Sequence, residues 1–221
     1  MAWIEYDTYY IFNAEQRSEA WLKIHKGRCS GSTIGACVDH SIFTTPKEQA
    51  KYLAEVEVKE FTELQRKNMD YGTRLEPIAR GWYEKSRKCV VKELGMAIPK
   101  WDKYLGVSVD GVVENQDGII EIKCVKRMYY PLKKYMGNPT NGYDHIWKTH
   151  YDQMMLGMAV LNKKWCDYIV YCPNENKVFV QRVPFDSKYW EDLYLKTKSF
   201  IETQLKPYGV DPVIPDDYSE K

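Results

Sequence analysis

The chain has 221 residues, of which 44% are hydrophobic and 29% are charged, as in an ordinary globular protein. It has no apolar run long enough for a membrane-spanning helix, and residues 1–11 lack the basic start of a secretory signal. The formal net charge of +1 excludes a strongly basic chain, so any contact with nucleic acid must come from a local patch. We therefore expect an intracellular protein that is not secreted.

The N-terminal part is expected to be irregular, aromatic chain over residues 1–12, followed by a helix to about residue 25. Asn13 and Gln16 have the spacing of a capping pair at the start of that helix. A polar, glycine-containing segment, residues 26–33, then leads into a second, short helix.

Two serines in this lead-in, Ser30 and Ser32, have two possible roles. A serine at a helix start can cap the helix through its side chain. The free backbone N–H groups of such a start can also hold a phosphate. The local sequence leaves both interpretations open.

Two further helices are expected over residues 45–68 and 70–87. The second has a clear apolar stripe, and Thr73 and Glu76 have the spacing of a capping box at its start. Glu76 therefore has a structural interpretation as a cap. It also has a functional one, as a carboxylate that faces a metal site.

A hairpin is predicted at the centre of the chain, after a strand over residues 89–98. Its first strand covers residues 105–113, its turn residues 115–118 and its second strand residues 119–125. The turn ends in Asp-Gly, and the second strand is rich in β-branched residues.

Three charged residues of this hairpin form a candidate site. Glu121 and Lys123 are two residues apart on a strand, so they point to the same face. Pairing of the two strands brings Asp110 near Glu121. Two adjacent carboxylates favour a bound cation, and hard oxygen ligands suit Mg²⁺ or Mn²⁺. The alternative is a surface hairpin with a cross-strand ion pair.

Residues 123–134 carry five Lys or Arg side chains, Lys126 and Arg127 among them, and no acid. This pattern fits either a solvated helix face or a contact with a phosphate backbone. The remaining elements are expected to be a helix over residues 144–161, strands over 164–171 and 177–183, a helix over 185–204, and an extended tail over 206–221. Gln153 lies on a polar stripe of the first of these helices.

The order of these elements predicts an α/β (α+β) fold in which helices flank a mixed central sheet. There is no internal repeat and no clear linker. We therefore expect a single domain over residues 1–221, with the tail at its end.

Five short motifs occur in order between about residues 20 and 185. They are Trp21 followed by Gly27 to Ser32, Gly72 to Pro77, Ser108 to Gly111, Glu121 to Cys124, and Tyr151 to Gln153. In this order they resemble the motifs of the phage lambda exonuclease (YqaJ-type viral recombinase) branch of the PD-(D/E)XK nucleases.

The resemblance implies a role for each residue of the hairpin. Asp110 and Glu121 correspond to metal ligands, with the backbone carbonyl of Ile122 as a third. Lys123 corresponds to the residue that positions or deprotonates the attacking water. Glu76 corresponds to a carboxylate that reaches the metal directly or through water. The implied cofactor is Mg²⁺, for which Mn²⁺ can substitute.

The resemblance also implies a pocket for a 5′-terminal phosphate, formed in part by Ser32 and Ser108, with Gln153 in the motif that completes it. The chain departs from the family there, since relatives carry Arg at the position of His25 and many carry Gln at that of Met155. Arg28 is a candidate substitute for the missing arginine, and Lys126 and Arg127 are candidate DNA contacts.

The implied function is that of a metal-dependent 5′→3′ exonuclease on linear double-stranded DNA, in the cytoplasm or nucleus of a host cell. Its implied partners are DNA with free ends and a single-strand annealing protein, and relatives include homo-trimers. One alternative is an endonuclease of the resolvase or restriction type, and another is a non-catalytic DNA-binding protein. A third, an iron–sulfur nuclease, needs four thiolates, and Cys166 and Cys172 are better explained as core residues.

Overall fold

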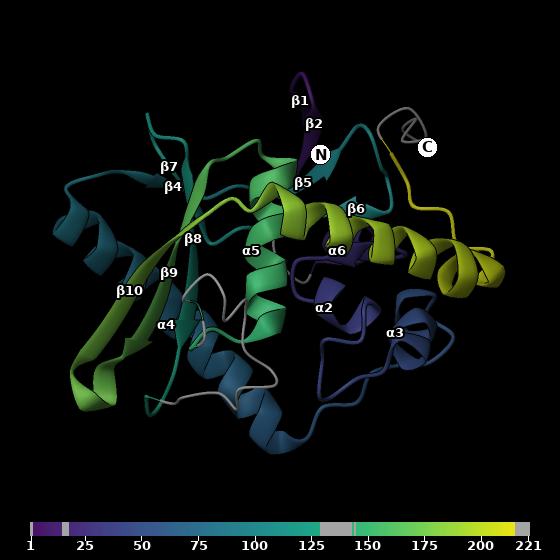
Figure 1. The fold of residues 1–221 in the computed structure, drawn as a ribbon. Helices are drawn as coiled ribbons and strands as arrows, with labels where there is room; N and C mark the ends of the chain where they lie inside the picture. The colour runs from purple at the N-terminus through teal and green to yellow at the C-terminus, as the bar shows by residue number, and fades with distance from the viewer. Residues whose placement is uncertain (1, 15–17, 129–142, 144, 215–221) are drawn as a thin grey trace.

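A five-stranded mixed sheet lies at the centre of the protein (Figure 1). The computed structural model describes residues 2–14, 18–128, 143 and 145–214. The strands of the sheet, in spatial order, are β10 (Lys177–Pro184), β9 (Trp165–Cys172), β8 (Gly118–Cys124), β7 (Gly111–Val113) and β4 (Val91–Lys92). The predicted mixed sheet flanked by helices is confirmed.

The central strand, β8, pairs with its two neighbours in opposite senses. It runs antiparallel to β7, with Gly111 opposite Ile120, and parallel to β9, with Glu121 opposite Tyr168. The predicted hairpin is therefore present, but its first strand is shorter than expected. Residues 105 and 106 leave this sheet and form a strand of another one.

Two smaller sheets stand beside the large one. The first is antiparallel and contains β1 (Ala2–Glu5), β2 (Tyr9–Asn13) and β5 (Met96–Pro99). The second pairs β3 (Cys29–Ser30) with β6 (Leu105–Gly106) in parallel. A bridge between Ala97 and Val107 connects the two.

The helices are α1 (Glu19–His25), α2 (Ile34–Cys37), α3 (Pro46–Leu53), α4 (Glu63–Arg87), α5 (Lys148–Val160) and α6 (Ser187–Phe200). Short turns complete the elements: 3-10 turns at Pro173–Glu175 and Lys206–Tyr208, and a π-helical turn at Ile201–Leu205. No helix within the described residues is long and apolar enough to cross a membrane.

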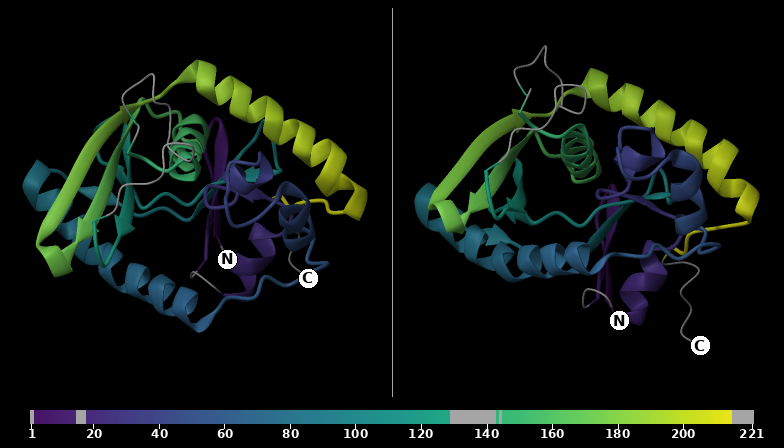
Figure 2. Two further views of the ribbon diagram at one scale, coloured as in Figure 1. Left: turned by 60° about the horizontal axis from the view of Figure 1, so that its bottom comes forward. Right: turned by 90° about the horizontal axis from the view of Figure 1, so that it is seen from below.

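The sheet has a helix layer on each face (Figure 2). Ile119 belongs to the larger core, which also contains buried residues of α2, α3, α5 and α6. Ile120 and Ile122 point the other way and pack against Ala79 and Tyr83 of α4. Because side chains alternate along β8, Glu121 and Lys123 share the face of Ile119 and α5.

Several N-terminal predictions were wrong. Residues 1–12 were expected to be irregular, but the described part of this segment contains the β1–β2 hairpin. Asn13 ends β2 and caps no helix, because Ser18 accepts the N–H of Trp21 and starts α1. Two aromatic residues of this segment, Trp3 and Phe12, are partners across the hairpin, and Tyr6 stacks on Tyr9 near its turn.

The predicted helices over residues 45–68 and 70–87 have different boundaries in the structure. The first ends as α3 at Leu53. The second, α4, starts at Glu63 after the N-cap residue Thr62, whose side chain forms a capping box with Gln65. Thr73 and Glu76 lie inside α4, so they do not form a cap. Glu76 therefore does not cap a helix, which was the structural interpretation of this residue.

The predicted C-terminal strands and helix are confirmed as β9, β10 and α6. The tail expected over residues 206–221 starts with the 3-10 turn, and residues 215–221 lie outside the described residues. The chain in between returns to the body of the protein, where the Tyr104 hydroxyl donates to the carbonyl of Val210 over 3.3 Å.

Candidate active site

The β7–β8 register brings Asp110 and Glu121 together. Gly111 pairs with Ile120, so the preceding residue, Asp110, is level with Glu121. The Oδ2 atom of Asp110 accepts the backbone N–H of Ile122 over 2.6 Å. The N–H and C=O groups of one strand residue project to the same edge, so the Ile122 carbonyl lies on the edge that carries Asp110.

Glu121 is buried, with only 3% of its surface exposed. Its Oε1 atom forms an ion pair with Lys123 Nζ over 2.6 Å, and among the described residues no group meets this oxygen with hydrogen-bond geometry. Burial raises the pKa of Glu121 to about 8, against the attraction of Lys123, and the charges of Asp110 and Glu76 raise it further.

Glu76 enters the site from α4. Burial raises the pKa of Glu76, and the charge of Asp110 raises it further. Arg80, one helical turn later, donates from Nη2 to Glu76 Oε1 over 3.1 Å and also pairs with Glu93. Arg80 was not predicted as a site residue, although an acid–base pair at i and i+4 on a helix can be recognised in a sequence.

The acidic residues fit a divalent cation. Their shifted pKa values show that three negative charges in this place are costly unless something neutralises them. No three His, Cys, Asp or Glu side chains converge closely enough to hold an ion on their own within the described part of the chain. A site with two carboxylates and a carbonyl suits Mg²⁺, which keeps waters and substrate oxygens as its other ligands.

Two adjoining cavities contain the candidate residues. One, of about 840 Å³, is lined by Glu76, Asp110 and Glu121. The other, of about 600 Å³, is lined by Ser32 and by other polar residues of α2 and α5. Both cavities share the side chains of Phe43, Thr44, Lys59, Lys123, His150 and Gln153. A ligand can therefore occupy both cavities at once.

Gln153 and Lys123 connect the two cavities. Lys123 Nζ donates to Gln153 Oε1 over 3.2 Å, which joins β8 to α5. Ser32 lines the 600 Å³ cavity, and its role in binding a phosphate stays a prediction. Ser108 lies close to Asp110 in the chain but lines neither cavity.

Arg28 and His25 do not line either cavity. The Arg28 side chain is completely buried and donates to the carbonyls of Ile24 and Val213. His25 bonds through Nδ1 to the carbonyl of Trp21 over 2.7 Å and lies against the Trp21 ring. Both side chains are thus held by the region around α1.

Lys126 and Arg127 are exposed just beyond β8. Lys126 Nζ donates to Asn68 Oδ1 over 3.0 Å and lies over the ring of Tyr71, so it contacts α4. The rest of the predicted basic stretch, residues 129–134, lies outside the described residues.

A buried polar cluster, absent from the sequence analysis, supports the 600 Å³ cavity. Asp152 is fully buried and accepts the Tyr189 hydroxyl over 2.6 Å and His40 Nδ1 over 2.8 Å. His40 in turn lines the cavity. Burial lowers the pKa of the neighbouring His150 well below its ordinary value, and its Nδ1 bonds to the Tyr168 hydroxyl. These contacts span elements far apart in the chain, which is why no local pattern indicates them.

The fold and the placement of the acidic pair define the fold class of the protein. The mixed sheet, with Asp110 before β7 and Glu121 and Lys123 on β8, is a PD-(D/E)XK-type fold. The alkaline exonuclease LHK-Exo from Laribacter hongkongensis has a similar fold, with a TM-score of 0.67, 22% sequence identity, and coverage of 87% of this chain and 95% of that one. The same protein in complex with dAMP gives a TM-score of 0.68 with the same identity and coverage.

A phage-related exonuclease from Haemophilus somnus is also similar, with a TM-score of 0.57, 14% identity, and coverage of 82% of this chain and 93% of that one. No curated protein matches the chain. Residues 20–164 match the model of the YqaJ-like viral recombinase domain, and the chain belongs to that family.

Proposed function

We propose that the protein is a Mg²⁺-dependent exonuclease that hydrolyses the phosphodiester bonds of linear double-stranded DNA from the 5′ end, in viral recombination or DNA processing. The observation that carries the proposal is the buried Glu121 carboxylate beside Asp110 and Lys123, in a cavity large enough for a nucleotide. Two solved proteins of the same fold are described as exonucleases.

In this mechanism Asp110, Glu121 and the Ile122 carbonyl would hold the cation, and Glu76 would bind one of its waters. A bound divalent cation supplies charge that neutralises the scissile phosphate and acidifies the attacking water. Lys123 orients that water and adds positive charge where the transition state is most negative. The polar wall that includes Gln153 positions the DNA strand.

The adjoining cavity supports the proposed direction of cleavage. We infer that a 5′-terminal phosphate binds near Ser32 while the next phosphodiester lies against Asp110 and Glu121. The shared residues Lys123 and Gln153 lie between the two positions. The Laribacter enzyme, which has the same fold, binds the mononucleotide dAMP, and this supports a site that holds one terminal nucleotide. A single-strand annealing protein and a homo-trimer remain proposals that rest on the family alone.

Replacement of Lys123 by methionine tests this function. Lys123→Met keeps the length of the side chain and removes the charge, so the initial rate on linear duplex DNA should fall at least about a hundredfold. Lys92→Met, on the edge strand β4, is a matched control and should digest DNA at the wild-type rate. The proposal fails if Lys123→Met digests DNA as fast as this control while both proteins melt like the wild type.

A further inference from the structure

The cavity near Ser32 needs a positive charge if it is to bind a phosphate, and the two basic residues expected there lie elsewhere. Arg28 and His25 are held by backbone carbonyls around α1. Lys123 already contacts Glu121 and Gln153. His40 is bonded to Asp152. A further cation in the cavity wall is Lys59.

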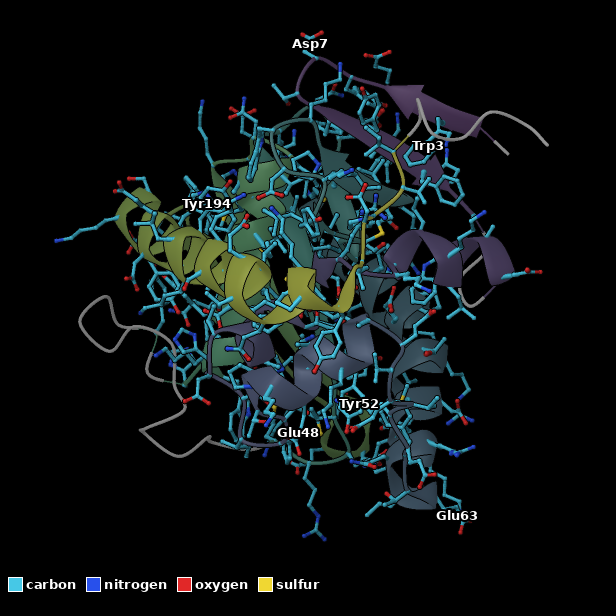
Figure 3. The ribbon with its side chains drawn as sticks, turned by 90° about the vertical axis from the view of Figure 1, so that its right-hand side faces the viewer. Trp3, Asp7, Glu48, Tyr52, Glu63 and Tyr194 are labelled. Atoms are coloured by element: carbon cyan, nitrogen blue, oxygen red, sulfur yellow. The ribbon has the colours of Figure 1, made fainter. Side chains whose placement is uncertain are left out.

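Lys59 lies in the connection between α3 and α4, and it lines both cavities. In Figure 3 this connection runs from α3, where Tyr52 is labelled, toward the start of α4 at Glu63. No sequence pattern indicated Lys59, because the connection has no regular pattern and one continuous helix was expected there. Its position depends on the fold, which turns the connection toward the cavities.

The ammonium group of Lys59 is held in place by polar and aromatic contacts. Its Nζ donates to Thr44 Oγ1 over 3.2 Å and lies 5.7 Å from the ring centre of Tyr52 and 5.8 Å from that of Phe61. Within the part of the chain that the structure describes, no carboxylate lies within ion-pair distance of Lys59. Withdrawal from water lowers the pKa of the Lys59 ammonium group. The attraction of Glu48 acts against this lowering. An oriented ammonium group that forms no close ion pair within the described residues is ready to bind an anion.

We propose that Lys59 binds the 5′-terminal phosphate of the DNA and determines the preference of the enzyme for phosphorylated ends. This inference rests on the proposed exonuclease function. The hydroxyl group of Ser32, which lines the same cavity, is a second donor. The Thr33 hydroxyl lines the cavity too but is bonded to the backbone of Ser30. Lysine acts here as a point charge, so it requires no bidentate geometry from the phosphate.

The test is a binding measurement in the absence of divalent metal ions, so that no DNA is cut. Two DNA hairpins of one sequence, each with a single duplex end, carry either a 5′-phosphate or a 5′-hydroxyl. Fluorescence anisotropy gives the affinity of each hairpin for the wild type, Lys59→Met, Lys59→Arg and Lys47→Met. Lys47 is an exposed lysine of α3 that lines neither cavity, so Lys47→Met is the matched control.

The wild type and Lys47→Met should bind the phosphorylated hairpin about tenfold more tightly than the hydroxyl one, as expected for a charge-assisted contact. Lys59→Met should bind both hairpins equally, with unchanged affinity for the hydroxyl end. Lys59→Arg should keep part of the preference, because it keeps the charge.

Three results would overturn the inference. The first is a wild type without any preference, and the second is a Lys59→Met variant that keeps the preference. The third is an equal loss of affinity for both hairpins, which would make Lys59 a general contact to the DNA backbone. Digestion of linear duplex DNA with Mg²⁺ is measured separately. If the wild type prefers the phosphorylated hairpin but does not digest DNA, only the exonuclease function is contradicted. If it digests DNA but binds both hairpins equally, only the role of Lys59 is contradicted.

Discussion

His25 stands where relatives carry Arg, and its side-chain contacts explain how it behaves with pH. It stacks on Trp21 at the end of α1, and burial lowers its pKa from 6.5 to about 4, with a smaller contribution from the charge of Arg28. Between these two pH values the unfolded chain binds a proton that the folded chain does not. The free energy of unfolding therefore falls as the pH falls from 6.5 to 4.

The variant His25→Gln removes this titration. The stability of the wild type relative to this variant should fall by about 2–3 kcal/mol between pH 7 and pH 4. Urea unfolding at a series of pH values measures the difference, in which groups common to both proteins cancel. Parallel stability curves would show that His25 keeps an ordinary pKa in the folded protein.

The site residues differ in how far the sequence could predict them. Asp110, Glu121 and Lys123 were predictable as a cluster because the alternation of a strand and the register of a hairpin fix their relative positions. Lys59, which lines both cavities, and Asp152, which holds His40 at the wall of one of them, were not predictable, because these contacts form only when distant elements pack together. Charged residues of the right kind near the site, such as Arg28, could not be ruled out before their burial was known.

Two glycines of the long helix α4, Gly72 and Gly81, are positions where we expect a substitution to stabilise the helix. A Cβ atom added at Gly72 or Gly81 meets no other atom within 4 Å. Alanine in a helix interior is more favourable than glycine by about 0.5–1 kcal/mol, so Gly72→Ala and Gly81→Ala should both stabilise the protein. Only Gly72 lines the cavity that contains Glu76.

The two alanine variants should therefore differ in DNA binding. A methyl group at Gly72 intrudes on the space that the DNA backbone would occupy beside α4, so Gly72→Ala should weaken the binding of duplex DNA. Gly81→Ala should bind DNA like the wild type. Thermal melting and anisotropy measure the two effects, and equal affinities for both variants would place the DNA away from this turn of α4.

Elements with strong local signals were predicted well, and short elements with distant partners were not. The strands β9 and β10 are long, rich in apolar residues and joined by a clear turn, and both were found. The predicted strand over residues 89–98 is divided between β4 and β5, which belong to different sheets. Pairing partners, which no local pattern contains, decide where such short strands end.

For the whole molecule, the two helix layers explain why the candidate site lies where β7 begins. The α5 side supplies Gln153, the α4 side supplies Glu76, and β8 between them supplies Glu121 and Lys123. The sheet class could be predicted from the order of the elements, whereas the two small sheets could not. A single domain over the whole chain stays a prediction.

The formal net charge of +1 also has a consequence for the whole molecule, because any general contact with DNA must come from local basic groups, of which Lys126 is a candidate. An enzyme that holds a terminal phosphate next to its cutting site acts only where the DNA has an end. An endonuclease of the same fold needs no end. Closed circular DNA therefore separates the two activities.

The most direct test is digestion, with Mg²⁺ or with a chelator, of three DNA substrates in parallel: 5′-phosphorylated linear duplex, 5′-hydroxyl linear duplex and covalently closed circle. We predict that with Mg²⁺ the phosphorylated duplex is degraded from its 5′ ends and fastest, the hydroxyl duplex more slowly, and the circle not at all. The chelator should abolish all digestion. Nicking of the closed circle, or digestion that continues in the chelator, would contradict a Mg²⁺-dependent exonuclease.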